Sequence, residues 1–112
     1  MKIKAFNILN QNGNPAANQI EMIIHKEDEI INIFQSYNSI IAQINYNTEY
    51  NNTLIIDNKA YTHSLTTTKY LNMWMDNNGI NPKEVKKIAN NGGGILKGEY
   101  KDLNIIISDL NN

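Results

Sequence analysis

The stretch of residues 64–75 constrains the fold more than any other part of the chain. It follows a run of strand-forming residues and carries the only tryptophan. Tyr70, Met73 and Trp74 recur at the spacing of one helical face, so the stretch predicts a helix with a broad apolar side. A helix of this kind has to cover strands that precede it in the chain. The stretch therefore predicts an α+β domain.

The ends of two helices are indicated by capping residues. We expect Thr66 to cap the first helix, which would begin one residue later, because a threonine hydroxyl can accept a bond from an unpaired backbone N–H. For the second helix we expect Asn81 to be the cap and Pro82 the first helical residue. The glycines at residues 92–94 predict a flexible connector from this helix to a strand.

Short apolar runs with a period of two residues predict the strands. Residues 19–26 place Ile20, Met22 and Ile24 on one face, and a charged tip then leads into a second run, which predicts an antiparallel hairpin. We interpret an interruption within residues 30–44 as a bend or bulge in one strand, although a short helix capped by Ser39 fits the same pattern. The predicted fold is a small antiparallel sheet of four to six strands packed against two short helices. The strand-forming runs are residues 2–9, 19–26, 30–37, 40–44, 53–57 and 103–108.

Two of these runs are apolar on both sides. Residues 30–34 predict a central strand, and residues 103–108 predict a final strand that is buried on both faces. Residues 45–52, by contrast, are polar and rich in asparagine and tyrosine. This composition predicts an exposed loop.

Length and composition limit the class of protein. A chain of 112 residues has the usual size of one domain, so we expect a single domain over residues 1–112. The net charge is −1 and arginine is absent, which disfavours both a basic nucleic-acid-binding face and an acidic mimic of DNA. Cysteine is absent, which excludes disulfides and cysteine-bound metals. We expect no membrane contact and a cytoplasmic location, because there is no span-length apolar run and no signal-peptide core.

The residues able to carry catalysis form no recognisable motif. His25 and His63 are the only histidines, and no ligand spacing links them to a metal site. Ser64 follows His63, with Asp57 upstream, but the Gly-x-Ser-x-Gly elbow of a serine nucleophile is absent. We interpret Ser64 as a turn or capping residue. The sequence therefore predicts no enzymatic activity, no cofactor and no metal.

The candidate partner-binding residues lie near the middle of the chain. Tyr46 and Tyr50 fall in the polar segment, where exposed tyrosines suit contact with another protein. Tyr61 and His63 follow the next predicted strand. We expect these four residues to bind a protein partner.

Three segments of the chain form a recognisable set: Ala17-Asn18-Gln19, residues 34–42 (Phe-Gln-Ser-Tyr-Asn-Ser-Ile-Ile-Ala) and residues 64–70 (Ser-Leu-Thr-Thr-Thr-Lys-Tyr). With them the chain resembles a family of small proteins encoded by tailed bacteriophages. The resemblance covers residues 17–75 and departs at Tyr61-Thr62-His63, where the family has Trp-Asp-Tyr. It implies a phage origin, a shared fold and a location in the host cell, and it implies no reaction.

From the resemblance and the lack of catalytic groups we expect a non-enzymatic, phage-type protein-binding module. Its partner would be a host or phage protein, and the specific expectation is an inhibitor of a host defence component, similar to an anti-CRISPR protein. An exposed edge strand in a small sheet also permits a homo-oligomer. The alternative is a nucleic-acid-binding accessory protein that uses Tyr100 and lysines near the C-terminus. These lysines are Lys83, Lys86, Lys87, Lys97 and Lys101.

Overall fold

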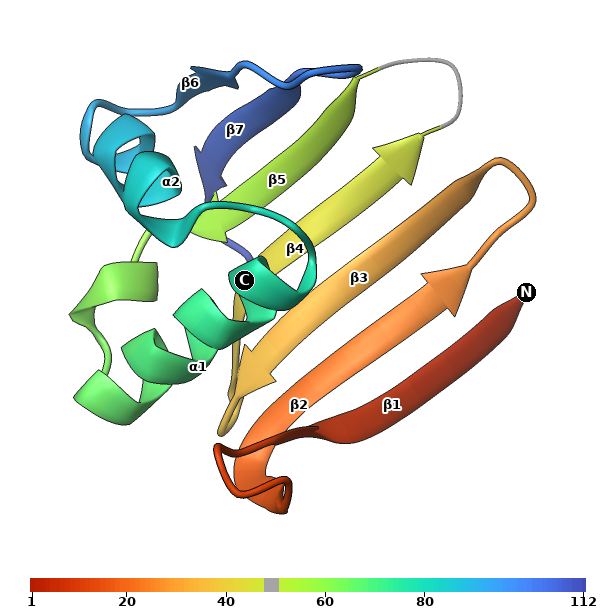
Figure 1. Ribbon diagram of the computed structural model, residues 1–112, viewed down its shortest axis with the longest axis vertical. Helices are drawn as coiled ribbons and strands as arrows, with labels where there is room; N and C mark the ends of the chain where they lie inside the picture. Colours follow the sequence, from red (N-terminus) through yellow and green to blue (C-terminus); the bar gives the residue numbers. More distant parts are fainter. Residues whose placement is uncertain (48–50) are drawn as a thin grey trace.

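Seven strands form one sheet in the part of the chain that the computed structural model describes, residues 1–47 and 51–112. Their order across the sheet is β1-β2-β3-β4-β5-β7-β6 (Figure 1). Each of the first four strands pairs antiparallel with the next. The strands are β1 Lys2–Leu9, β2 Pro15–His25, β3 Glu29–Ser36, β4 Ser39–Asn47, β5 Asn52–Asp57, β6 Gly94–Leu96 and β7 Leu103–Ser108.

The helices of the described residues lie on one face of this sheet, the front face in Figure 1. They follow β5, and the chain then returns through β6 to β7. Because the return passes through helices rather than a tight turn, β7 can pair with β5 in parallel, and it does so. The helical segments are the 3-10 helix η1 Ala60–Thr62 and the α-helices α1 Leu65–Asn77 and α2 Pro82–Asn90.

The predicted α+β class is confirmed, but the strand count and the purely antiparallel sheet are wrong. The sequence predicted four to six strands, whereas residues 1–47 and 51–112 contain seven. The strand Gly94–Leu96 was missed because three residues are too few to show a period. The parallel pairing of β5 with β7 was missed because strand partners that are distant in sequence leave no local signal.

The interruption at residues 36–39 is a tight turn, so both the bent-strand interpretation and the short helix are wrong there. Ser36 of β3 pairs with Ser39 of β4, and the turn consists of Tyr37 and Asn38. Tyr37 has a φ of 54°, in the left-handed region that two-residue hairpin turns use. A shift of register does occur near this turn, but the extra residue lies in β4: Phe34 pairs with Ala42 and Gln35 with Ile40, which leaves Ile41 unpaired in the register.

The first helix begins two residues earlier than predicted. Its cap is Ser64 rather than Thr66, since the Ser64 hydroxyl accepts a hydrogen bond from the N–H of Thr67 at 3.2 Å. The Thr67 hydroxyl is itself buried and lies 2.8 Å from the hydroxyl of Ser36. The interpretation of Ser64 as a capping residue is confirmed, and its neighbour Thr67 ties the start of α1 to β3.

The second helix begins as predicted. The side-chain oxygen of Asn81 accepts hydrogen bonds from the N–H groups of Lys83 and Glu84, and Pro82 is the first helical residue. The helix ends at Asn90, and the glycines that follow lead into β6. These ends were predictable because every residue that determines them is local.

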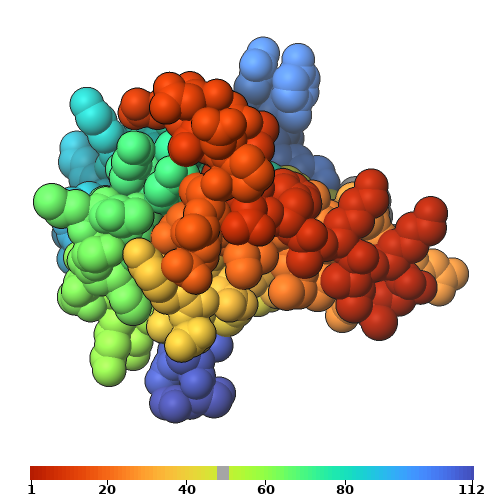
Figure 2. All heavy atoms as spheres, turned by 90° about the horizontal axis from the view of Figure 1, so that it is seen from below, coloured from red at the N-terminus to blue at the C-terminus, as the bar shows by residue number. Residues whose placement is uncertain are grey.

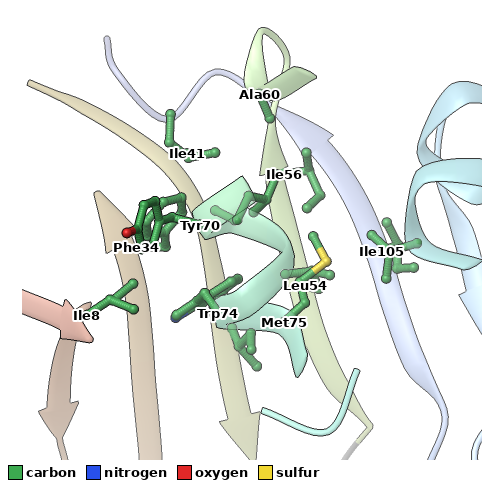
Figure 3. Packing of buried hydrophobic residues seen from close by; sticks show 14 of the residues in the cluster. Ile8, Phe34, Ile41, Leu54, Ile56, Ala60, Tyr70, Trp74, Met75 and Ile105 are labelled. Atoms are coloured by element: carbon green, nitrogen blue, oxygen red, sulfur yellow. The ribbon is translucent and has the colours of Figure 1, made fainter. Parts of the chain in front are cut away.

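Trp74 lies at the centre of the apolar core between α1 and the sheet (Figure 3). Its side chain is fully buried, and its ring stacks on Phe34 of β3 with centroids 6.0 Å apart and 26° between the ring planes. Tyr70 is buried in the same cluster, so the predicted core position of the helical aromatics is confirmed. The remaining core residues come from both sheet and helices and include Ile8, Ile41, Ala42, Ile44, Leu54, Ile56, Leu71, Met75, Val85 and Ile105.

β7 is buried on one face only. Ile105 is 2% exposed, whereas its neighbour Ile106 is 48% exposed. The prediction that this strand is buried on both faces is therefore wrong. The reason is that α1 and α2 lie on the same side of the sheet (Figure 1).

A glycine packed against β7 gives a test of this arrangement. Gly93 has a φ of +108°, and a Cβ atom there would lie 2.7 Å from the carbonyl oxygen of Ile105. Gly92 has a φ of +90°, but a Cβ atom at that position would meet nothing within 4 Å. We expect Gly93→Ala to lower the free energy of unfolding by about 1–3 kcal/mol more than Gly92→Ala, because only the first adds a clash to the backbone strain. Urea denaturation followed by tryptophan fluorescence measures both, and equal losses would contradict the close packing.

Candidate protein-binding surface

One face of the sheet is left uncovered by the helices of the described residues, and the strand register identifies its side chains. Residues paired across antiparallel strands share a face, so Met22, Ile33 and Gln43 stand side by side on β2, β3 and β4. We call this side of the sheet the open face. Its apolar members, apart from Ala5, are Ile3, Ile20, Met22, Ile24, Ile31, Ile33, Ile40, Ile55, Ile95 and Ile106.

The open face is almost free of charge and is most apolar on β1, β2 and β3, whereas β4, β5 and β7 also carry amide and hydroxyl side chains such as Asn45, Thr53 and Asn104. Its only acidic or basic side chains among the paired positions are Glu29 and Asp57, which lie at opposite ends of the strands. Towards the two edges of the sheet the apolar side chains are well exposed, with Ile3 at 58% and Ile95 at 54%. The solvent side of an antiparallel sheet normally carries polar residues. A nearly uncharged face with exposed isoleucines on strands at both of its edges is therefore typical of a surface that contacts another molecule.

The C-terminal residues form a rim at one end of the open face. The carboxylate of Asp57 accepts hydrogen bonds from the N–H of Leu110 at 2.9 Å and from the side-chain amide of Asn111 at 3.1 Å. Asn111 also bonds the backbone N–H and C=O of Ile40 in β4. Figure 2 shows this end of the chain, in dark blue, projecting from the molecule. These contacts hold the rim at the ends of β4 and β5.

Two of the predicted partner-binding tyrosines come from the segment that was expected to be a loop. Tyr46 instead belongs to β4, which runs to Asn47, and β5 begins at Asn52, so the loop prediction is wrong for both ends of residues 45–52. The Tyr46 ring is half-buried, and its hydroxyl donates to the side-chain oxygen of Asn78 at 2.8 Å. Tyr50 lies outside the described residues.

The other two predicted residues lie at the opposite end of the sheet from Tyr46 (Figure 1). Tyr61 is half-buried in η1, and the Lys86 ammonium lies 5.5 Å from the centre of its ring. The Tyr61 hydroxyl is buried without a hydrogen-bond partner among the described residues. His63 is exposed just after η1. The structure therefore does not bring these residues together with Tyr46 into one site.

A buried polar network connects α1 to the middle of the sheet. The indole N–H of Trp74 donates to the side-chain oxygen of Asn32 at 3.0 Å, and the Asn32 amide donates to Glu21 at 2.7 Å. The Asn32 amide also reaches the side-chain oxygen of Asn78 at 3.2 Å, which is the acceptor for Tyr46. Burial, and then the negative charge of Glu21, raise the pKa of the Tyr46 hydroxyl above its ordinary value. The network fixes the helix on the sheet.

Some of the lysines expected to bind nucleic acid in the alternative hypothesis contact other residues of this chain. Lys97 forms an ion pair with Asp102 at 3.2 Å, and the Lys101 ammonium donates to the carbonyl oxygen of Asn47. Both lysines line a pocket of about 300 Å³ beside Tyr46. The pKa of Asp102 is lowered by the hydrogen bonds from the Gly98 N–H and from Lys97. The ion pair reduces the unpaired positive charge at Lys97, whereas the carbonyl contact positions Lys101 without neutralising it.

Residues 1–47 and 51–112 contain neither a cluster of metal ligands nor a membrane-spanning helix. In these ranges no three His, Asp or Glu side chains gather where they could hold a metal ion. His25 ends β2 and His63 follows η1, at opposite ends of the sheet (Figure 1). No helix of the same ranges is long and apolar enough to cross a membrane.

The open face was missed in the sequence although its signal was present. Residues 30–34 and 103–108 are apolar on both sides, and this pattern was interpreted as a central strand for the first run and as a strand buried on both faces for the second. The pattern reports only that both faces avoid water. It does not say whether the second layer belongs to this chain or to another molecule.

Comparison with known proteins identifies a family. The model of a family of unknown function, DUF8033, matches residues 1–91, which is most of the chain. The matched part spans β1 to α2 and so includes most of the open face. No curated protein and no solved structure matches the chain.

Two tyrosine hydroxyls with different surroundings form a matched test of the site geometry. Tyr46→Phe removes a hydroxyl that donates to Asn78, so we expect the free energy of unfolding to fall by about 0.5–1.5 kcal/mol. Tyr61→Phe removes a buried hydroxyl that has no partner in the described residues, so we expect no loss or a small gain. Chemical denaturation at pH 7 measures both, and a larger loss for Tyr61→Phe would contradict this assignment.

Stability at high pH tests the surroundings of Tyr61 separately. Burial raises its pKa to about 12 from the ordinary 10.0. Between these values the unfolded chain loses a proton that the folded chain keeps, so the free energy of unfolding falls as the pH rises from 10 towards 12. We expect this fall to be smaller in Tyr61→Phe than in the wild type. Identical pH profiles of the two proteins would show that Tyr61 is not protected from ionisation.

Proposed function

We propose that this chain, which belongs to the DUF8033 family, is a non-enzymatic protein-binding module whose binding surface is the open face of its sheet. The observation that carries the proposal is the isoleucine-rich, nearly uncharged surface that runs across β1 to β6 with no helix of the described residues over it. Its polar members are amide and hydroxyl side chains, such as Gln43 and Thr53. Such groups suit contact with a polypeptide better than proton transfer.

The size of the open face supports a binding role. Seven strands about 4.8 Å apart and roughly 20 Å of paired length per strand correspond to a face of roughly 600 Å². About half of the paired side chains of this face are apolar, so its apolar part is on the order of 300 Å², which falls within the range of about 300–600 Å² for the largest apolar patch on a typical monomer, a size that is often functional. Covering the apolar part of this face with a partner would stabilise the complex by roughly 25 cal/mol per Å² of apolar surface removed from water.

The identity of the partner stays a prediction from the sequence. The bacteriophage resemblance favours a host or phage protein, and a host defence component is its most specific form. The open face adds a chemical requirement, since a partner needs an apolar surface of matching size rather than a charged one. An uncharged face does not attract phosphates, so no feature of it favours the nucleic-acid alternative.

Site-specific photo-crosslinking in cells tests the proposal. The photoreactive residue p-benzoylphenylalanine replaces Ile33 near the middle of the open face or, as the matched control, Leu65 at the start of α1, which is 90% exposed. We expect irradiation to link the chain to a polypeptide from position 33 and not from position 65. The proposal would be overturned if no crosslinked product formed from position 33, or if positions 33 and 65 gave equal amounts of crosslinked product.

A further inference from the structure

We infer that the partner of the open face is a second copy of this chain, stacked sheet to sheet in a two-fold symmetric dimer. The inference rests on the proposed function and names its partner. In such a dimer the same patch of both copies forms the interface, so the patch has to match itself in charge, polarity and area. The open face meets each of these conditions.

The charge distribution allows the face to meet its own copy. Any charged group near the centre of a two-fold interface would come close to the same group of the partner, and like charges inside an interface are costly. The two acidic residues of the open face, Glu29 and Asp57, lie at opposite ends of the strands and leave the centre neutral. The carboxylate of Asp57 is moreover occupied by Leu110 and Asn111 of the C-terminal rim. Two copies can therefore approach through the centre of the face without like-charge repulsion.

The polar side chains of the face are also compatible with themselves. Gln43 lies on the middle strand, between Ile33 of β3 and Ile55 of β5. An amide carries both donors and acceptors, so it can bond to the same amide of a second copy, which a carboxylate or an ammonium cannot do. Aliphatic neighbours on both sides would exclude water from such a contact.

The area is sufficient for a stable dimer. A face of roughly 600 Å² on each copy buries about 1,200 Å² in total, which is the lower end of the range for specific interfaces. Two twisted sheets can stack in this way at about 10 Å separation with their strands within about 30° of each other. The helices of each copy would then form the outer layers. The dimer would have the order helix, sheet, sheet, helix.

Sedimentation velocity of the purified full chain tests the dimer. We expect a species of twice the chain mass of 12.8 kDa, with its fraction rising between about 1 and 100 μM. Ile33→Lys places a charge at the centre of the interface, and we expect it to raise the dissociation constant at least tenfold. Leu65→Lys, which puts the same charge on α1, should leave the dimer unchanged. Circular dichroism confirms that each variant is folded.

A second variant covers the case in which Ile33→Lys does not fold. Gln43→Lys changes a residue that is already polar and only half-buried, and we expect the same shift to monomer. A wild type that stays monomeric up to 100 μM, or dimers that both charge variants leave intact, would overturn the inference. The photo-crosslink from position 33 separates the two proposals. A crosslink to a different protein with a monomeric wild type leaves the proposed function standing, whereas a monomer without any crosslink removes both.

Discussion

The fold depends on how the Trp74 indole satisfies two requirements at once. Its ring is fully buried on Phe34, and its N–H, which would be costly to bury alone, donates to Asn32 in the same strand. Asn32 in turn is held by Glu21 of β2 and by Asn78 at the end of α1. One side chain thus fixes the position and the direction of α1 over β3. Since α1 is the first helix of the connection from β5 to β7, its placement also directs the return of the chain.

Local features of the fold were predictable from the sequence, and features that depend on distant partners were not. The start of α2 followed from Asn81 and Pro82 because a cap acts within a few residues. The start of α1 was predicted two residues too late because Ser64 and Thr66 are both suitable caps. The buried contact of Thr67 with Ser36 of β3 favours Ser64 as the cap. The tight turn at Tyr37 was missed because its left-handed backbone is imposed by the pairing of β3 with β4.

The candidate site shows the same division. Tyr46 was predicted to contact a partner because its polar neighbours indicated exposure, and Tyr61 was added from the segment after the next predicted strand. Both rings are half-buried, in different elements. The proposed binding surface includes Ile33 and Ile106, which lie in runs that the sequence predicted to be a central strand or to be buried on both faces. Hydrophobic periodicity shows which side chains of a strand avoid water. It does not show what covers the side chains on the open face, because the local pattern carries no information about the covering layer.

The two edges of the sheet limit what any assembly of this chain can become. β6 has only three residues and begins at Gly94, so it offers a short template for a further strand. β1 carries the exposed Lys2 and Lys4, and charged side chains on an edge strand oppose in-line addition of another chain. Growth by continued strand pairing, which leads to fibres, is therefore hindered on both sides. An assembly formed through the open face instead stops growing once that face is covered. The molecule can therefore keep apolar side chains on its open face and still form complexes of finite size.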